Sequence, residues 1–183
     1  MVPGLAPCPD GSPTSVLIAY HSAGGTTEQL ARAVAEGVER VDGVCAVLRQ
    51  VADVTRDDLV DARGLILGSP TYYANIAGPM KTFIDEWLLR YNVYFGDKVG
   101  GAFATGGGVT GGKEHVVVSL LLAMMNNGAI VAGPTDRDGD VQFGYPGASA
   151  VDPGPGEPLP ESDLDAGRAL GERVARVAAQ LAG

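Results

Sequence analysis

Three apolar runs in this chain each end in a loop of glycine and small hydroxyl residues, and each loop leads into a segment with helical periodicity. The runs and their loops are VLIAY-HSAGGTT (16–27), LILG-SPTYY (65–73) and GGAFA-TGGGVTGG (100–112). Short continuous apolar runs are typical of strands buried on both faces of a parallel sheet. In such a sheet, the loops at the carboxyl ends of the strands meet along one edge, where ligands bind. The pattern therefore predicts an α/β fold with its site among the three loops.

Strands and helices alternate along the whole chain. We expect five strands, at 16–20, 44–48, 65–68, 99–104 and 129–132. Apolar residues at helical spacing predict helices over 27–40, 80–88, 116–126 and 170–181, and the polar crossover at 57–62 has room for one helical turn. Right-handed crossovers between these strands give a doubly wound parallel sheet with helices on both faces. Five strands favour the order 2-1-3-4-5 over a longer dinucleotide-binding sheet. The connection 134–162, rich in Gly, Pro and Asp, is expected to be a functional cover or a partly mobile segment.

Length, charge and cysteine content limit the function classes. The 183 residues suit one domain at 15–183, preceded by a flexible lead-in at 1–14. A net charge of −9 without a concentrated basic face argues against a nucleic-acid partner. No apolar stretch approaches the ~20 residues of a membrane span, and the first residues do not resemble a secretory signal. Cys8 lies in the lead-in and Cys45 in a predicted strand, so we expect no disulfide framework and a cytoplasmic, reducing compartment.

The first loop, 21–27, predicts a phosphate cradle without charged side chains. Ser22, Thr26 and Thr27 offer hydroxyl groups, the glycines let backbone amides approach an anion, and the next helix points its positive end at the same place. A glycine-rich turn that only joins strand to helix is the alternative. The loop lacks the G-x-G-x-x-G fingerprint of dinucleotide binding. The later GGVTGGK (107–113) resembles a nucleotide-triphosphate P-loop, but Glu114 replaces the hydroxyl residue that holds Mg²⁺, so we consider that match accidental.

The second and third loops suit a flat aromatic ligand. Pro70 stiffens the exit of the strand, and Tyr72 and Tyr73 are expected either to lie against a ligand ring or to cover an edge of the core. The third loop, 105–112, is costly to order because it is rich in glycine. It would expose several amides to one acceptor edge. A flavin ring has such an edge, and its negative charge after two-electron reduction would be stabilised there.

Together these segments resemble the flavodoxin-like superfamily, and more narrowly the WrbA type of FMN-dependent NAD(P)H:quinone oxidoreductase. The most specific string is GSPTYYANIAGPMKTFIDEW (68–87), supported by the first loop, by TGGGVTGGKE (105–114) and by NNGAIVAG (126–133). The resemblance implies FMN as the bound cofactor, with these contacts: Ser22, Ala23, Gly24, Gly25, Thr26 and Thr27 at the phosphate; Pro70, Thr71, Tyr72 and Tyr73 at the ring and ribityl chain; Thr105, Gly106, Gly107 and Gly108 at the pyrimidine edge. Four features depart from the family pattern. Gly24 replaces a hydroxyl residue, the third loop is about two residues longer, Asn127 stands where family members often have His, and the Trp that they often have near Arg90 or Tyr91 is absent.

The resemblance implies an enzyme that passes two electrons from NAD(P)H to a quinone or similar acceptor, with no catalytic side chain and no metal. A flavodoxin-type electron carrier and a flavin-binding regulatory module are the alternatives. The aromatic segment 85–98 favours the enzyme, because it suits a substrate-pocket wall or a subunit contact, and the resemblance suggests a homodimer or homotetramer. His21 and His115 are expected to be structural or solvated more often than proton donors. The acidic tract 136–140 is expected to be a solvated turn, because its spacing does not match a calcium loop.

Overall fold

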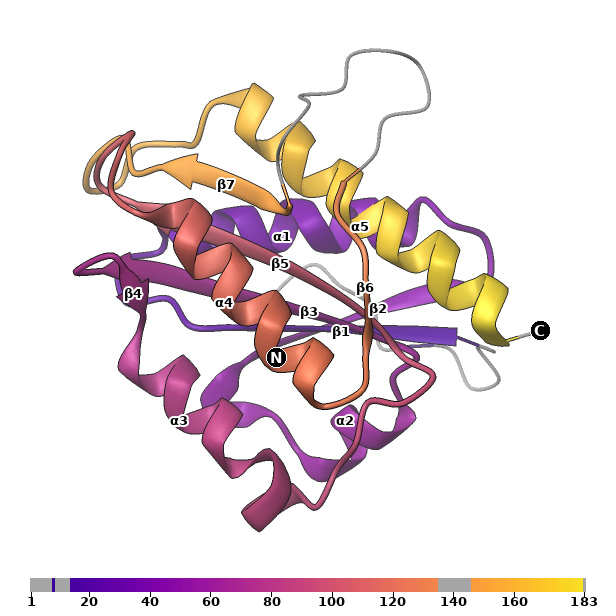
Figure 1. Ribbon diagram of the computed structural model, residues 1–183. Coiled ribbons are helices and arrows are strands. Elements are labelled where there is room, and N and C mark those ends of the chain that lie inside the picture. Colours follow the sequence, from indigo (N-terminus) through magenta and orange to yellow (C-terminus); the bar gives the residue numbers. More distant parts are fainter. Residues whose placement is uncertain (1–7, 9–13, 135–145, 183) are drawn as a thin grey trace.

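A parallel sheet forms the centre of the protein. The computed structural model describes residue 8 and residues 14–134 and 146–182 (Figure 1). The main strands are β1 (Thr14–Tyr20), β2 (Val44–Gln50), β3 (Gly64–Tyr72), β5 (Val99–Gly106) and β6 (Ile130–Val131). They lie in the order β2-β1-β3-β5-β6 and pair in parallel, so the predicted order 2-1-3-4-5 is confirmed. Two short strands, β4 (Asn75–Ile76) and β7 (Ala148–Val151), complete the seven-stranded sheet.

The fifth position of the sheet is occupied by two separate strands. β6 pairs with Val99 and Gly100 at the start of β5, and β7 pairs with residues 103–106 at its end. The connection 134–162, expected to be a functional cover or a partly mobile segment, therefore contributes a strand that the sequence analysis did not predict. Gly147 permits the return of the chain, because a Cβ at this position would lie 2.0 Å from the carbonyl oxygen of Ala102. The acidic tract 136–140 lies outside the described residues.

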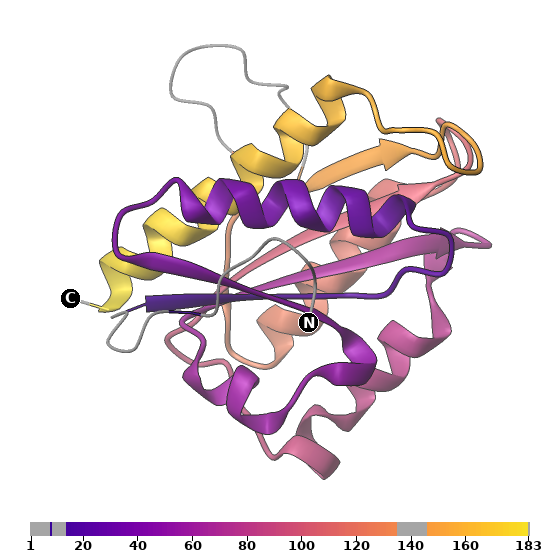
Figure 2. The ribbon, with the colours of Figure 1, turned by 180° about the vertical axis from the view of Figure 1, so that it is seen from behind.

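Helices cover both faces of the sheet, as predicted. Helices α1 (Thr26–Glu39) and α5 (Glu161–Ala182) lie on one face, and α2 (Arg56–Asp61), α3 (Gly78–Glu86) and α4 (Lys113–Asn126) lie on the other (Figures 1 and 2). The short segments η1 (Val51–Asp53) and η2 (Trp87–Tyr91, a π-helix) belong to the second face. Each face has its own apolar core, and the strands, buried on both sides, separate the two.

Glycines allow α1 and α5 to pack in direct backbone contact. A Cβ on Gly37 would lie 2.0 Å from the carbonyl oxygen of Arg168, and one on Gly171 would lie 2.0 Å from that of Val34. Arg168 also bridges the two helices through an ion pair with Glu36 at 2.8 Å. This contact holds α1, which follows the first loop directly, against α5.

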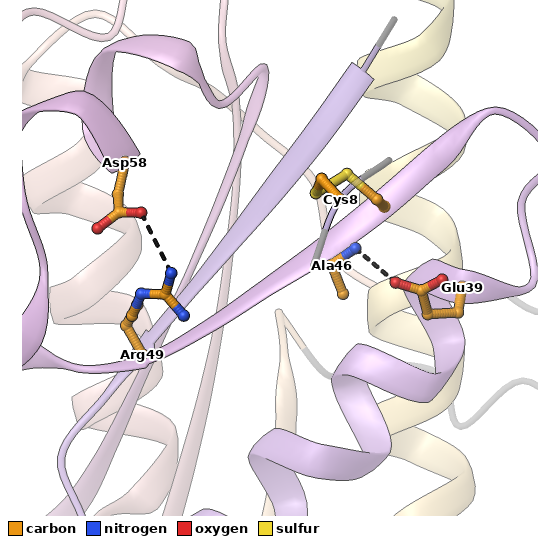
Figure 3. Close-up of a disulfide and its surroundings, with 6 residues drawn as sticks. Cys8, Glu39, Ala46, Arg49 and Asp58 are labelled. Carbon is orange, nitrogen blue, oxygen red and sulfur yellow. Dashed lines mark hydrogen bonds and ion pairs between the residues drawn. A yellow bond between two sulfur atoms is a disulfide. The ribbon is translucent and has the colours of Figure 1, made fainter. Parts of the chain in front are cut away.

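A disulfide joins the lead-in to the sheet. The Cys8 and Cys45 sulfur atoms are 1.99 Å apart, and Cys45 lies on the edge strand β2 (Figure 3). The expectation of unpaired cysteines was wrong, because nothing in the local sequence pattern indicates a pairing across 37 positions. The argument from cysteine content for a reducing compartment no longer holds, and the cytoplasmic location stays a prediction. Beside the disulfide, the carboxylate of Glu39 accepts a hydrogen bond from the Ala46 amide at 2.7 Å.

None of the helices in the described ranges is long and apolar enough to cross a bilayer.

Candidate functional site

The three glycine-rich and hydroxyl-rich loops lie side by side at one edge of the sheet. They follow β1, β3 and β5, which are adjacent and parallel, so their carboxyl ends meet at the left of Figure 1. The sequence-based expectation that the loops gather at one edge is confirmed. Two contacts tie them together: the Thr27 and Thr105 hydroxyls are 2.7 Å apart, and a Cβ on Gly112 would lie 2.7 Å from the Cβ of Ala74.

The first loop is shaped around the Ser22 hydroxyl. Its oxygen accepts hydrogen bonds from the amides of Gly25 at 3.1 Å and Glu28 at 3.3 Å. Because both bonds use the oxygen as acceptor, the hydroxyl proton of Ser22 remains available for an anion. Gly25 precedes α1 with φ of +95°, a conformation that suits glycine. The first helical bond runs from the Gln29 amide to Gly25, so the amides of Thr26 and Thr27 precede the helical hydrogen-bond ladder.

Thr27 and Thr105 connect the first loop to the third. Both residues are about 2% exposed, and their hydroxyls share one hydrogen bond. Each hydroxyl has one proton and two lone pairs, so one of the two is left with a proton for another acceptor. Gly24, in the same loop as Thr27, has open space around its Cβ position.

The second loop is a tight hairpin on the extended end of β3. Tyr73 and Ala74 have φ of +51° and +58°, as in a type I′ turn between Tyr72 and Asn75. Tyr72 is 46% exposed and Tyr73 is fully exposed, so neither ring covers the core. Ser69, which the sequence analysis did not select, holds the hairpin base: its hydroxyl donates to the Pro70 carbonyl and accepts from the Ala77 amide.

Thr71 has a buried hydroxyl oxygen without a hydrogen-bond partner in the structure. A buried hydroxyl that is unpaired costs free energy, so such atoms are rare, and a site for a ligand, an ion or a water molecule is one explanation for them. Thr71 lies at the centre of the three loops, because β3 is between β1 and β5 and its end is beside Gly106. A ligand with polar atoms at this edge would satisfy that hydroxyl.

The third loop closes over a lysine that the sequence analysis set aside. Lys113 is 3% exposed, and its ammonium group donates to the carbonyls of Gly108 at 2.7 Å and Val109 at 3.1 Å. The GGVTGGK string therefore places its lysine inside the loop. In the same loop, Gly107 and Gly108 have open space at their Cβ positions. The signal that was available is the position of Lys113 at the first turn of a strongly apolar helix, where a lysine is unusual.

A fourth segment, 152–159, also reaches this edge. The Asp152 amide donates to the carbonyl of Gly106 at 2.9 Å, which places the end of β7 beside the third loop. Gln29 of α1 holds the rest of the segment, because it donates to the Glu157 carbonyl and accepts from the Leu159 amide. Sequence reasoning missed this segment because β7 was not expected.

The aromatic segment 85–98 does not line the loop edge. It leads to Val99, where β5 begins at the opposite edge of the sheet, and Trp87, Tyr91 and Phe95 are buried in the core. Of the two expectations for this segment, the substrate-pocket wall was wrong, and the subunit contact stays a prediction. The physical reason is the alternation of its side chains: Trp87, Tyr91 and Phe95 pack inward, while Leu89 (89% exposed) and Tyr94 face outward.

The two histidines differ in their surroundings. His21 follows β1 directly, its amide donates to the Gly68 carbonyl at 3.0 Å, and burial lowers the pKa of its imidazole below the usual 6.5. His115 is exposed on α4. Across the described ranges, no group of three or more His, Cys, Asp or Glu side chains is arranged to hold a metal ion.

Amide and hydroxyl donors thus converge from three loops without a carboxylate among the loop side chains at 22–27, 69–73 and 105–112. Such a surface stabilises negative charge by preorganised dipoles. It favours a ligand with a phosphate at one end and a planar acceptor edge at the other.

Comparison with known proteins identifies the family. Residues 14–136 match the family model of NADPH-dependent FMN reductase. A flavodoxin of Aquifex aeolicus is 36% identical over 87% of this chain and 84% of its own length, and an NAD(P)H dehydrogenase (quinone) of Geobacter sulfurreducens is 32% identical over 92% of this chain and 100% of its own. The crystal structure of a flavodoxin, WrbA-like protein from Agrobacterium tumefaciens superposes with a TM-score of 0.69 at 27% identity, over 91% of this chain and 98% of that one. The chain therefore has a flavodoxin-like fold and belongs to the NADPH-dependent FMN reductase family.

Proposed function

We propose that this protein is an FMN-dependent oxidoreductase that passes two electrons from NAD(P)H to a quinone or a similar acceptor. FMN as the cofactor and NAD(P)H as the electron donor follow from the family, whose description names FMN and NADPH. The observation that carries the proposal is the convergence of three loops, rich in amide and hydroxyl donors, around the unpaired hydroxyl of Thr71. The quinone acceptor rests on the printed function of the Geobacter relative.

The residues of the first loop fit the phosphate of FMN. Ser22 retains a hydroxyl proton, and the amides of Thr26 and Thr27 stand at the positive end of α1. The loop contains no Lys or Arg, so dipoles rather than charges would hold the phosphate. Ala23, Gly24 and Gly25 leave room for it, since a Cβ at Gly24 or Gly25 would meet nothing within 4 Å.

The second and third loops fit the ring. FMN would provide a hydrogen-bond partner for the Thr71 hydroxyl. Pro70, Tyr72 and Tyr73 would flank the ring and the ribityl chain. Thr105, Gly106, Gly107 and Gly108 would offer backbone amides to the pyrimidine edge. When bound, FMN supplies the redox chemistry, and the chain's residues bind and orient it, exclude water and tune its charge.

A flavodoxin-type electron carrier is the second candidate, and two observations favour it. The Aquifex relative is named a flavodoxin, and the net charge of −9 would suit a basic redox partner. The segment 85–98 no longer argues against a carrier, because it lies away from the loop edge. Direct oxidation of NAD(P)H therefore has to decide between the two.

The test is a turnover assay with the FMN-loaded protein, NADH or NADPH, and benzoquinone, followed by nicotinamide absorbance. If the protein is an enzyme, it should oxidise the nicotinamide steadily, at a rate that depends on both the protein and the quinone. Ser22→Ala removes the phosphate donor and should raise the FMN concentration needed for half-maximal rate. Ser119→Ala, on α4, is the matched control and should leave it unchanged. A protein that binds FMN but does not oxidise either nicotinamide, although a separate reductase reduces its flavin, is a carrier.

We also propose that the protein forms a homodimer or homotetramer. Exposed apolar residues support self-association: Leu88, Leu89 and Tyr94 lie near η2, and Val118, Leu122 and Met125 share one face of α4. Light scattering at micromolar concentration with FMN bound should give a multiple of the 18.7 kDa chain mass, and a monomer mass would contradict this.

A further inference from the structure

Lys113 is a buried cation at a place where a cation is unfavourable. Its side chain lies within the third loop, and the ion pairs formed by the described residues do not include it. It is also the first residue of α4, where the helix dipole is already positive. A buried charge without a counter-charge is expensive.

Holding the loop alone does not require a charge. A neutral donor satisfies a backbone carbonyl at a lower desolvation cost than an ammonium group. The combined positive potential of Lys113 and the α4 N-terminus therefore points to an anion that binds at this edge. Thr71 supplies independent support, because its buried hydroxyl lacks a partner beside the stem of Lys113.

The hydrogen bonds of Lys113 set the direction of two peptide groups. The carbonyls of Gly108 and Val109 turn toward the ammonium group. In a trans peptide the N–H points opposite to the carbonyl, so the amides of Val109 and Thr110 point away from the lysine. The lysine stem lies under Gly106, where a Cβ would be 3.1 Å from its Cγ and 3.4 Å from the Cβ of Thr71.

We propose that Lys113 is a positioning residue that raises the two-electron reduction potential of the bound flavin. It aims the third-loop amides outward, and it adds a positive charge behind the loop that faces the pyrimidine edge. This inference rests on the proposed binding of FMN. Two-electron reduction leaves negative charge on that edge, so a nearby positive charge favours the reduced form over the oxidised form.

The expected effect is a shift in potential. Replacement of Lys113 by Met keeps the apolar stem and removes the charge and the donors. We expect at least a tenfold smaller preference for the reduced form, which corresponds to about −30 mV for a two-electron couple. Lys113→Arg retains the charge and the donors and should restore most of the potential.

The experiment measures the midpoint potential of FMN bound to the full-length protein by spectroelectrochemistry, together with the FMN dissociation constant. Lys81→Met is the matched control, because Lys81 is exposed on α3 and pairs with Asp85. Circular dichroism and thermal unfolding of each apoprotein test folding. If Lys113→Met does not fold, Lys113→Gln replaces it with the same expected direction, since glutamine is also uncharged.

The outcomes separate this inference from the proposed function. A lower potential in Lys113→Met, restored in Lys113→Arg and unchanged in Lys81→Met, supports the positioning role. FMN binding with a wild-type potential in the folded uncharged variant overturns the role of Lys113 and leaves the proposed function intact. A wild-type protein that does not bind FMN overturns both.

Discussion

The hydrogen bond between the Thr27 and Thr105 hydroxyls provides a quantitative test of how the loops are held together. The two oxygens are 2.7 Å apart, and both residues are about 2% exposed. Valine has nearly the shape of threonine but lacks the hydroxyl. Thr27→Val alone therefore leaves the Thr105 hydroxyl buried without a partner, and Thr105→Val alone has the opposite effect.

The magnitudes follow from the burial of the two groups. Each single variant should lower the free energy of unfolding by about 1–3 kcal/mol, because one buried polar atom is left unsatisfied. The double variant places two apolar groups in contact and should cost no more than about 1 kcal/mol. The two substitutions should therefore be non-additive by at least about 1 kcal/mol in a double-mutant cycle.

The assay is urea unfolding of the apoprotein followed by circular dichroism, with the m-value checked for constancy. Thr82→Val is the control, because Thr82 is exposed on α3 and its replacement should change stability by less than about 0.5 kcal/mol. Additive losses, with the double variant as unstable as the sum of the singles, would refute the contact between the first and third loops.

Three further predictions concern the scaffold. Gly171→Ala should cost about 1–3 kcal/mol, because its Cβ would meet the Val34 carbonyl, whereas Gly96→Ala has open space and should change little; thermal unfolding compares the two. Cys45→Ala should lower the free energy of unfolding in oxidising buffer by up to about 4 kcal/mol, because it removes a cross-link that spans 37 positions. If the reduced wild-type protein were as stable as the oxidised one, the disulfide would not stabilise the native state. The imidazole of His21 should titrate with a pKa below 6.5 by NMR, and a pKa above that value would contradict its burial. Because the unfolded chain takes up the proton at a higher pH than the folded chain, the free energy of unfolding should fall as the pH drops from 6.5 toward the pKa of the folded state.

The order of the sheet was predictable because its strands are continuous apolar runs. Val16–Tyr20 and the stretch before Ser69 are buried on both faces, and that burial appears directly in the residue types. The convergence of the three loops then followed from the rule that parallel strands end at the same edge.

Features that depend on distant partners were not predictable. β7 is a four-residue strand whose hydrogen bonds all go to β5, and its sequence ASAV carries no strong strand signal. The disulfide depends on the position of Cys8 beside Cys45 of β2. The segment 85–98 was expected to form a substrate-pocket wall or a subunit contact, but its Trp87, Tyr91 and Phe95 pack in the core, because aromatic side chains suit either place.

The chemistry of the candidate site was predictable, but the side-chain hydrogen bonds that hold its loops in place were not. The hydroxyl and glycine positions were visible in the sequence, whereas the roles of Ser69 and Lys113 depend on which carbonyl each side chain reaches. In a P-loop motif, the lysine contacts the phosphates of the ligand. Here Lys113 instead donates hydrogen bonds to carbonyls of its own loop.

The most direct test of the central claim is a titration of the apoprotein with FMN and, separately, with riboflavin, followed by quenching of flavin fluorescence. The account predicts saturable binding of one FMN per chain, weaker binding of riboflavin because it lacks the phosphate, and only a small effect of salt because the cradle uses dipoles instead of charges. No binding of FMN, or riboflavin binding as tight as that of FMN, would contradict it.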